Sequence, residues 1–335
     1  MNPAYHIYGV GNALVDTEIE VDDTFLNTAG IEKGLMTLVD EERQHKLLEL
    51  LADHLVASKR ASGGSAANTI IAASCFGSRA FYSCKVANDD NGHFYLADLE
   101  KAGVDSNFHS ERQQGITGKC LVMITPDAER TMNTYLGITE TFSTAELNID
   151  ALRASQYLYI EGYLVTSPTG RAAAIEARQT AVKHQVKTAM SFSDPGIVEH
   201  FKDGLRDMAG NRLDMLFCNE AEAMSWTNTT TVELAAEALK DTAECFAITL
   251  GARGALIFDG TSLHQIAGHP TKAIDTNGAG DMFAGAFLHA LCQGWGYVEA
   301  GKFACQAAAT VVSQFGPRFP IEKHQEVIRQ YRNDS

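Results

Sequence analysis

Strand-like and helix-like segments alternate along most of this chain, and this order restricts the folds that it can adopt. Helical periodicity is found in Glu41–Val56, Asn68–Phe76, Ser167–His184 and Thr231–Thr242. Short β-rich runs predict strands at Tyr5–Gly11, Ala80–Val86, Gln156–Glu161, Lys187–Phe192, Asp214–Cys218 and Cys245–Leu250. Because strands joined through helices lie parallel, the sequence predicts an α/β fold with helices on both faces of a central, mainly parallel sheet.

Two stretches depart from this alternation. Ala13–Asp22 alternates apolar and polar residues, as a half-exposed strand does, and Gly115–Leu136 has the pattern of a hairpin that turns at Pro126 and Asp127. We expect both to belong to a small, one-sided, antiparallel sheet outside the main one. Such a sheet, standing off an α/β core, is well placed to act as a lid over a ligand.

The composition excludes several classes of function. The chain has 335 residues, 45% of them hydrophobic, which is enough for a large core. A net charge of −15 without a cluster of Lys and Arg argues against a nucleic-acid partner. No apolar run approaches the roughly 18 residues of a membrane helix, and the N-terminus lacks a basic leader, so neither a membrane partner nor a signal peptide is expected. The seven scattered cysteines form no Cys-x-x-Cys pair, which fits a reducing, cytoplasmic location.

The segment Asp275–Leu288, DTNGAGDMFAGAFL, carries the strongest chemical signal. A turn of small residues, Gly278, Ala279 and Gly280, runs directly into a helix, where unpaired N–H groups and the helix dipole favour an anion. Asp281 lies in the first turn of that helix. Its carboxylate could accept a hydroxyl proton while the N–H groups hold a phosphoryl group. The alternative role for Asp281 is to cap the helix.

Two glycine-containing segments nearer the N-terminus could bind an acceptor. Ser62–Asn68, SGGSAAN, opens a helix, and its amides and the Asn68 side chain could bind sugar hydroxyls; a flexible turn with a helix cap is the alternative. Gly9–Asp16 begins like a dinucleotide fingerprint, but Leu14 replaces the third glycine and the segment continues as a strand, which disfavours a dehydrogenase. Asp16 has apolar neighbours, where an unpaired carboxylate is costly, so a pair of sugar hydroxyls would be a suitable partner.

Two segments that follow later strands could serve a nucleotide. Asn219 and Glu222 could order water around a metal, unless they only cap a helix. Thr249 ends a strand, and Gly251 and Gly254 allow backbone to approach a ligand, although a plain hairpin explains the same residues. Because all of these segments lie at the carboxyl ends of predicted strands or at helix starts, we expect them on one rim of the sheet, where open α/β sheets bind ligands.

Together, these motifs resemble those of the ribokinase or PfkB carbohydrate kinase family across nearly the whole chain. G-N-x-x-x-D, G-G-x-x-x-N, N-x-x-E, T-x-G-x-x-G and D-T-x-G-A-G-D occur in the family's order. The resemblance implies a ribokinase-like three-layer fold in a single domain over residues 1–335, with a small β-sheet lid from segments near 13–40 and 108–138. It also implies a kinase that phosphorylates an alcohol and uses ATP, Mg²⁺ and, in many members, K⁺.

The resemblance implies a role for each matching residue. Asp281 would be the base for the acceptor hydroxyl, beside an anion hole of Gly278, Ala279 and Gly280. Acceptor binding would involve Asn12, Asp16, Gly63, Gly64 and Asn68. The ATP site would be lined by Asn219, Glu222, Thr249, Gly251 and Gly254, with Glu222 organising Mg²⁺ through water and Asp275 near a monovalent-cation loop.

Within the family, the segments GNALVD, GGSAAN and DAERTM look most like the adenosine kinase branch, where an arginine matching Arg130 approaches the phosphates. One departure is that Leu164, after Tyr163, replaces an aromatic residue that often stacks on adenine. The expected acceptor is a nucleoside, with the 5′-hydroxyl of adenosine first; ribose, fructose or a related sugar is the alternative. A non-catalytic binding protein of the same fold is disfavoured by Asp281 after an intact GAG turn. A monomer or homodimer is expected.

Overall fold

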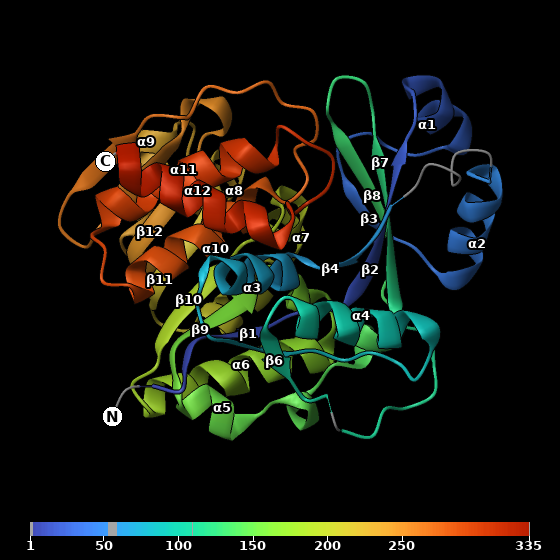
Figure 1. The fold of residues 1–335 in the computed structure, drawn as a ribbon, viewed down its shortest axis with the longest axis horizontal. Helices are drawn as coiled ribbons and strands as arrows, with labels where there is room; N and C mark the ends of the chain where they lie inside the picture. Colours follow the sequence, from blue (N-terminus) through green and yellow to red (C-terminus); the bar gives the residue numbers. More distant parts are fainter. Residues whose placement is uncertain (1–2, 53–58, 109, 335) are drawn as a thin grey trace.

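The computed structural model describes residues 3–52, 59–108 and 110–334, which form a large and a small β-sheet (Figure 1). The strands of the large sheet are, in spatial order, β14 (Leu263–Ile266), β13 (Ala255–Phe258), β12 (Ala243–Thr249), β11 (Leu213–Asn219), β10 (Lys187–Ser191), β9 (Ser155–Glu161), β1 (Tyr5–Val10), β5 (Ala80–Ser83) and β6 (Val104–Ser106). The strands from β12 to β6 pair in parallel, and β13 and β14 are antiparallel additions at one edge. The predicted mainly parallel sheet is confirmed.

Helices cover both faces of the large sheet. One face carries α3 (Ser65–Phe76), α4 (Asp90–Lys101), α10 (Ala279–Cys292), α11 (Tyr297–Val311) and α12 (Ile321–Asp334). The other carries α5 (Ile149–Arg153), α6 (Pro168–Lys183), α7 (Pro195–Ala209), α8 (Glu220–Thr227) and α9 (Val232–Leu239). Neighbouring residues of β9 point to opposite cores, Leu158 to one and Tyr159 to the other, as the two-residue repeat of a strand requires. No helix in the described part of the chain has the length and apolar character needed to cross a bilayer.

The small sheet contains both stretches that depart from the alternation. Its strands are, in spatial order, β3 (Met36–Leu38), β8 (Arg130–Tyr135), β7 (Gly118–Ile124), β2 (Leu14–Glu20) and β4 (Lys59–Gly63). The predicted hairpin is confirmed, since β7 and β8 pair in antiparallel fashion. The prediction that the whole sheet is antiparallel is wrong, because β2 pairs with β7, and β3 with β8, in parallel. The chain passes through the large body between β2 and β7, so no turn forces them to run in opposite directions.

Neither face of the small sheet is fully open to solvent, whereas the predicted one-sided sheet would have one open face. Two helices, α1 (Asp23–Ala29) and α2 (Glu41–Leu50), pack on its outer side through Leu26, Leu47 and Met123. Its inner side faces the large body (Figure 1).

Most differences from the predicted boundaries are short. The structure ends β5 at Ser83 and begins α3 at Ser65. Helix α2 ends at Leu50, and positions 53–56 of the predicted helix lie outside the described residues.

Candidate active site

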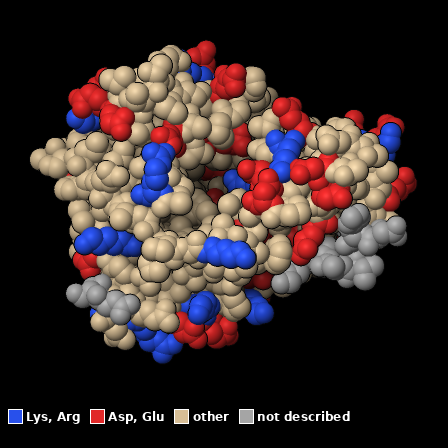
Figure 2. All heavy atoms as spheres, turned by 90° about the horizontal axis from the view of Figure 1, so that it is seen from above, with Lys and Arg blue, Asp and Glu red and all other residues tan. Residues whose placement is uncertain are grey.

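A pocket lies between the carboxyl edge of the large sheet and the inner side of the small sheet. It holds about 680 Å³ of empty space, solvent at its mouth included. In Figure 2 the surface is hollowed between the larger body and the smaller lobe. Its lining includes six of the predicted site residues: Asn12, Asp16, Gly64, Asn68, Arg130 and Asp281.

The anion loop, residues 275–280, leads into α10 at one side of this pocket. Gly278 has a φ of 74°, and a Cβ added there would lie 2.4 Å from the carbonyl oxygen of Pro317, so the turn requires glycine. Asp275 is fully buried and accepts N–H bonds from Asn277 (2.8 Å) and Gly316 (2.9 Å). These contacts fix the turn, so the first amides of α10 lie beside Asp281, where helices bind anions.

Two side chains of α3 hold Asp281. Ser65 Oγ donates to its Oδ1 (2.6 Å) and Asn68 Nδ2 donates to its Oδ2 (3.2 Å). Burial raises the pKa of Asp281, although the Ser65 bond and the charge of Arg130 act in the opposite direction. Asn68 therefore contacts the proposed base as well as the pocket, and its Oδ1 has no partner in the described part of the chain. Ser65 was not predicted, although it lies within the same SGGSAAN motif.

The glycine loop packs directly on the predicted acceptor residues. A Cβ at Gly63 would lie 2.0 Å from Oδ2 of Asp16, and one at Gly64 would lie 2.3 Å from the Asn12 carbonyl oxygen. Gly64 also has a φ of 96°, which favours glycine. Burial, and then the charge of Glu18, raises the pKa of Asp16 to about 8. Donation from hydroxyl groups of a ligand would favour the ionised form of this carboxylate.

Glu161 is a pocket residue that the sequence analysis missed. It ends β9, and its carboxylate accepts bonds from the Asn12 amide (3.2 Å), from Asn12 Nδ2 (3.1 Å) and from the Ala66 amide (2.7 Å). Burial raises the pKa of Glu161 to about 7 against the effect of these donors. Glu161 thus joins β9, the β1–β2 connection and the start of α3. Glu161 could have been identified from the sequence as a carboxylate at the end of an otherwise apolar strand.

The β7–β8 turn of the small sheet contacts the anion loop. Thr276 Oγ1 donates to the Ala128 carbonyl (3.3 Å), and Arg130 Nη1 donates to Asn277 Oδ1 (3.3 Å). The predicted Arg130 therefore lies at the pocket, where it brings a positive charge toward Asp281.

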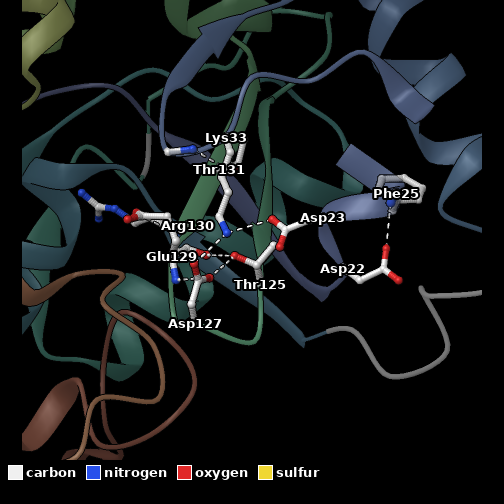
Figure 3. Close-up of polar contacts among 10 residues, drawn as sticks. Asp22, Asp23, Phe25, Lys33, Thr125, Asp127, Glu129, Arg130 and Thr131 are labelled. Atoms are coloured by element: carbon white, nitrogen blue, oxygen red, sulfur yellow. Dashed lines mark hydrogen bonds and ion pairs between the residues drawn. The ribbon is translucent and has the colours of Figure 1, made fainter. Parts of the chain in front are cut away.

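Ion pairs on the far side of the same turn connect it to α1. Lys33 Nζ lies 2.8 Å from an Asp23 oxygen and 2.7 Å from an Asp127 oxygen. Thr125 Oγ1 also donates to Asp127 (2.6 Å). Figure 3 shows Lys33 between the two aspartates, with the Arg130 side chain directed away from them.

The small sheet gives the pocket an apolar wall. Its members come from β2, β3 and β8 and the residue after β8: Leu14, Met36, Leu38, Met132 and Leu136. Tyr163 also lines the pocket, from the segment that follows β9. Leu164 does not line the pocket. It is buried in the core between the large sheet and the helices α5 to α9.

The five predicted nucleotide residues lie on the same carboxyl edge but do not line this pocket. Asn219 and Thr249 are paired at the ends of β11 and β12, and Gly251 and Gly254 follow Thr249. Asn219 and Glu222 form a reciprocal capping box at the start of α8, with bonds of 2.9 Å in each direction. For Asn219 and Glu222 the sequence analysis left two roles open, and this is the capping role. Burial raises the pKa of Glu222 to about 7.

The pocket therefore combines three chemical features. A partly accessible carboxylate, Asp281, lies where it could receive a proton, the N-terminus of α10, where helices can bind anions, lies beside it, and Arg130 adds a positive charge. Such groups stabilise the transfer of an anionic group to a hydroxyl. Among the described residues, no cluster of three or more His, Cys, Asp or Glu side chains could hold a metal ion.

Comparison with known proteins identifies relatives over nearly the whole chain. The model of the pfkB family of carbohydrate kinases matches residues 38–324. An adenosine kinase from Schizophyllum commune is 27% identical, over 96% of this chain and 99% of its own. An adenosine kinase from Saccharomyces cerevisiae is 28% identical, over 94% of this chain and 96% of its own.

Two solved structures are similar in both sequence and fold. The adenosine kinase from Sinorhizobium meliloti superposes with a TM-score of 0.90 at 32% identity, over 97% of this chain and 99% of its own. A probable sugar kinase from Rhizobium etli superposes with a TM-score of 0.91 at 31% identity, over 98% of each chain. The predicted ribokinase-like fold is confirmed.

Proposed function

Because this chain belongs to the PfkB family of carbohydrate kinases, and is thus a phosphotransferase with an alcohol acceptor, we propose that it transfers the γ-phosphoryl group of ATP to the 5′-hydroxyl of adenosine. The observation that carries the choice of a nucleoside is the mixed lining of the pocket. Polar groups such as Asp16 and Asn68 line it together with the apolar side chains of the small sheet. A ribose with an attached base offers partners to both kinds of side chain, whereas a free sugar offers nothing to the apolar ones.

The proposed roles of the acceptor residues follow from their positions. Asp16 would accept hydrogen bonds from the 2′- and 3′-hydroxyls, while Gly63 and Gly64 let the loop approach the ribose. Asn12 and Asn68 Oδ1, which has no partner among the described residues, are further polar groups in the pocket. The base would pack between Tyr163 and the apolar wall, which does not involve Leu164.

In the proposed reaction, Asp281 accepts the proton of the 5′-hydroxyl as its oxygen attacks the γ-phosphorus. The new O–P bond forms as the bond to the β-phosphate oxygen breaks, and ADP leaves with that electron pair. The first amides of α10, at Ala279 and Gly280, would hold the transferring phosphoryl oxygens after the Gly278 turn. Arg130 would neutralise part of their charge.

ATP would extend from the anion loop along the carboxyl edge toward Asn219, Thr249, Gly251 and Gly254. Mg²⁺, where bound, neutralises the phosphate oxygens. It commonly keeps several waters and uses few protein carboxylates, which fits the buried Glu222 acting through water. The proposal also includes a monovalent cation bound near Asp275. Excess chelator should abolish turnover, and replacing K⁺ by tetramethylammonium tests the second cation.

The acceptor is tested by measuring kcat/KM for adenosine, 2′-deoxyadenosine, ribose and fructose with the same enzyme preparation. The proposal predicts adenosine to be the best acceptor and 2′-deoxyadenosine to be poorer, because the deoxy compound lacks one hydroxyl of the diol. Equal values for the two nucleosides would contradict the role of Asp16. A higher value for ribose or fructose would make this a sugar kinase, the description given to the Rhizobium etli protein.

A further inference from the structure

Three consecutive residues after α11 connect the two loops that build the pocket. The Gly316 amide donates to Asp275 Oδ2 (2.9 Å), and Pro317 packs against Gly278, so both contact the anion loop. The next residue, Arg318, turns to the other loop, where its Nη2 donates to the Ser62 carbonyl (2.7 Å). The anion loop and the glycine loop are therefore fixed to one short segment.

Arg318 is enclosed by polar partners from two elements, β4 and α4. Its side chain is only 13% exposed, and Nη2 also lies 3.2 Å from Ser62 Oγ and 3.0 Å from Asp98 Oδ2, on α4. Ser62 Oγ donates to the same Asp98 oxygen. Burial acts to raise the pKa of Asp98, but the charge of Arg318 and the bonds from Ser62 and Arg318 hold it below its usual value. The three side chains thus form a compact, charge-assisted network.

This network lies directly behind the acceptor side of the pocket. Ser62 precedes Gly63, whose Cα is packed on the Asp16 carboxylate, and pairs with Val15 of β2. The carbonyl oxygen of Gly63 accepts a hydrogen bond from Tyr95 OH (3.0 Å). A shift of the Ser62 backbone would therefore move Gly63 and Gly64 relative to Asp16. The charge of Arg318 also acts directly on Asp16, whose pKa it lowers against the effect of burial.

We propose that Arg318 is a positioning residue for the acceptor: it holds the backbone of Ser62–Gly64 against Asp16 and keeps that loop in register with the anion loop. It contacts neither substrate. The inference rests on the proposed function, in which Asp16 and the glycine loop hold the ribose. Without Arg318 the Ser62 carbonyl loses its guanidinium donor and Asp98 its counter-ion, so the loop is expected to relax away from its present position.

The test compares Arg318→Ala and Arg318→Lys with the natural chain. We expect Arg318→Ala to raise KM for the acceptor roughly tenfold, since the loss of one hydrogen bond to the ribose is worth about that factor. The KM for ATP and kcat should change less than about threefold, which is the pattern of lost acceptor binding. Arg318→Lys should recover part of the loss. The matched control is Arg153→Ala, which removes a half-exposed arginine on α5 that is paired with Asp150.

A second readout does not depend on turnover. Hydrogen exchange of the ligand-free protein should become faster in residues 60–66 in Arg318→Ala but not in Arg153→Ala. If Arg318→Ala fails to fold, the double variant Arg318→Met/Asp98→Leu, which removes both charges, serves for the same two measurements.

Unchanged acceptor KM together with unchanged exchange would overturn the proposal. So would an equal loss in kcat and in both KM values, which would indicate general destabilisation. A natural chain that phosphorylates no nucleoside or sugar would instead contradict the proposed function, and faster exchange in Arg318→Ala would still support the link to the loop.

Discussion

At the scale of single residues, Asp281 is the group on which turnover should depend most. Its carboxylate is fixed by Ser65 and Asn68 next to the first amides of α10. In Asp281→Asn the side chain keeps a similar shape but cannot accept the hydroxyl proton. We expect kcat to fall by about 10²- to 10⁴-fold, the usual contribution of a general base. ATP affinity should change little, because the proposed anion site consists of backbone amides, which the substitution leaves in place.

The measurement is kcat from ADP release together with calorimetric binding of a non-hydrolysable ATP analogue. Ser65→Ala is the control, because it removes one hydrogen bond and leaves the carboxylate in place, and it should lose far less activity. Near-normal turnover in Asp281→Asn would exclude Asp281 from proton transfer.

His289, on the buried side of α10, should make stability depend on pH. Burial lowers its pKa from 6.5 to about 4, and Ser78 Oγ lies 2.9 Å from Nδ1. The folded state favours the neutral ring, so its contribution to stability is complete above pH 6.5 and is lost as the pH falls toward 4. Linkage gives a loss of about 2 kcal/mol by pH 5.

The check is urea denaturation at pH 7 and pH 5 for the natural chain and for His289→Asn. The variant removes the titrating ring and keeps a polar group near Ser78. Its stability at pH 7 should be lower, because a cavity is left, but its decrease toward pH 5 should be smaller. Parallel decreases in both proteins would show that His289 does not titrate in this way.

Single residues also show how far the sequence could predict the site. Asp281 and Asp16 were predictable because their glycine neighbours are close in sequence, so a short motif contains the geometry. Glu161 was not, because the amides that it accepts from, at Asn12 and Ala66, lie 149 and 95 residues away and only folding brings them together. Ser65 was missed for the same reason, since its partner is 216 residues away.

At the scale of elements, local patterns predicted six strands of the large sheet, β1, β5, β9, β10, β11 and β12, and its helices α3, α6 and α9. The helices α4, α5, α7, α11 and α12 were not predicted. The start of α3 was misplaced by three residues because no side chain caps it: Gly64, in an unusual conformation, takes that position. The pairing of β2 with β7 could not be predicted, since register between strands about a hundred residues apart depends on the packing of everything between them.

The ion pairs of Lys33 with Asp23 and Asp127 connect the β7–β8 turn to α1. Removing them tests whether the turn must be held in place. In Lys33→Met the apolar stem remains and both ion pairs are lost. Because exposed ion pairs contribute little to stability, we expect kcat/KM to fall by up to about fivefold and the melting temperature to change little. The fall should be largest at low ionic strength, where the natural pairs are least screened.

Lys323→Met is the control, since it breaks a comparable exposed pair with Glu326 on α12. Both variants should be measured for kcat/KM at low and high salt. An effect of Lys33→Met that does not exceed that of Lys323→Met would mean that Arg130 and Ala128 keep their positions without the Lys33 ion pairs.

At the scale of the whole molecule, the reactive groups are divided between two bodies. Asp281 and the anion loop belong to the large body, whereas Asp16, Arg130 and the apolar wall belong to the small sheet. On the β4 side the two bodies are joined firmly by the bonds of Arg318 and Asp98 to Ser62. Across the pocket, the β7–β8 turn meets the anion loop through Thr276–Ala128 and Arg130–Asn277, both at 3.3 Å. Two long hydrogen bonds hold this turn weakly, so its closure over the site should depend on the acceptor.

We therefore expect the acceptor to slow hydrogen exchange in the small sheet, in the segments near 13–40 and 108–138, whereas helix α9 on the large sheet, which does not line the pocket, should exchange at an unchanged rate. A ligand that contacts both bodies favours the closed arrangement by its differential affinity for that state, and closure keeps water from the phosphoryl group. The measurement compares exchange in the free protein, with adenosine alone, and with adenosine and a non-hydrolysable ATP analogue. The analogue alone is the control, because it would contact mainly the large body and should protect the small sheet less. If adenosine is shown by calorimetry to be bound and exchange in these segments does not change, the small sheet is a fixed wall and does not act as a lid.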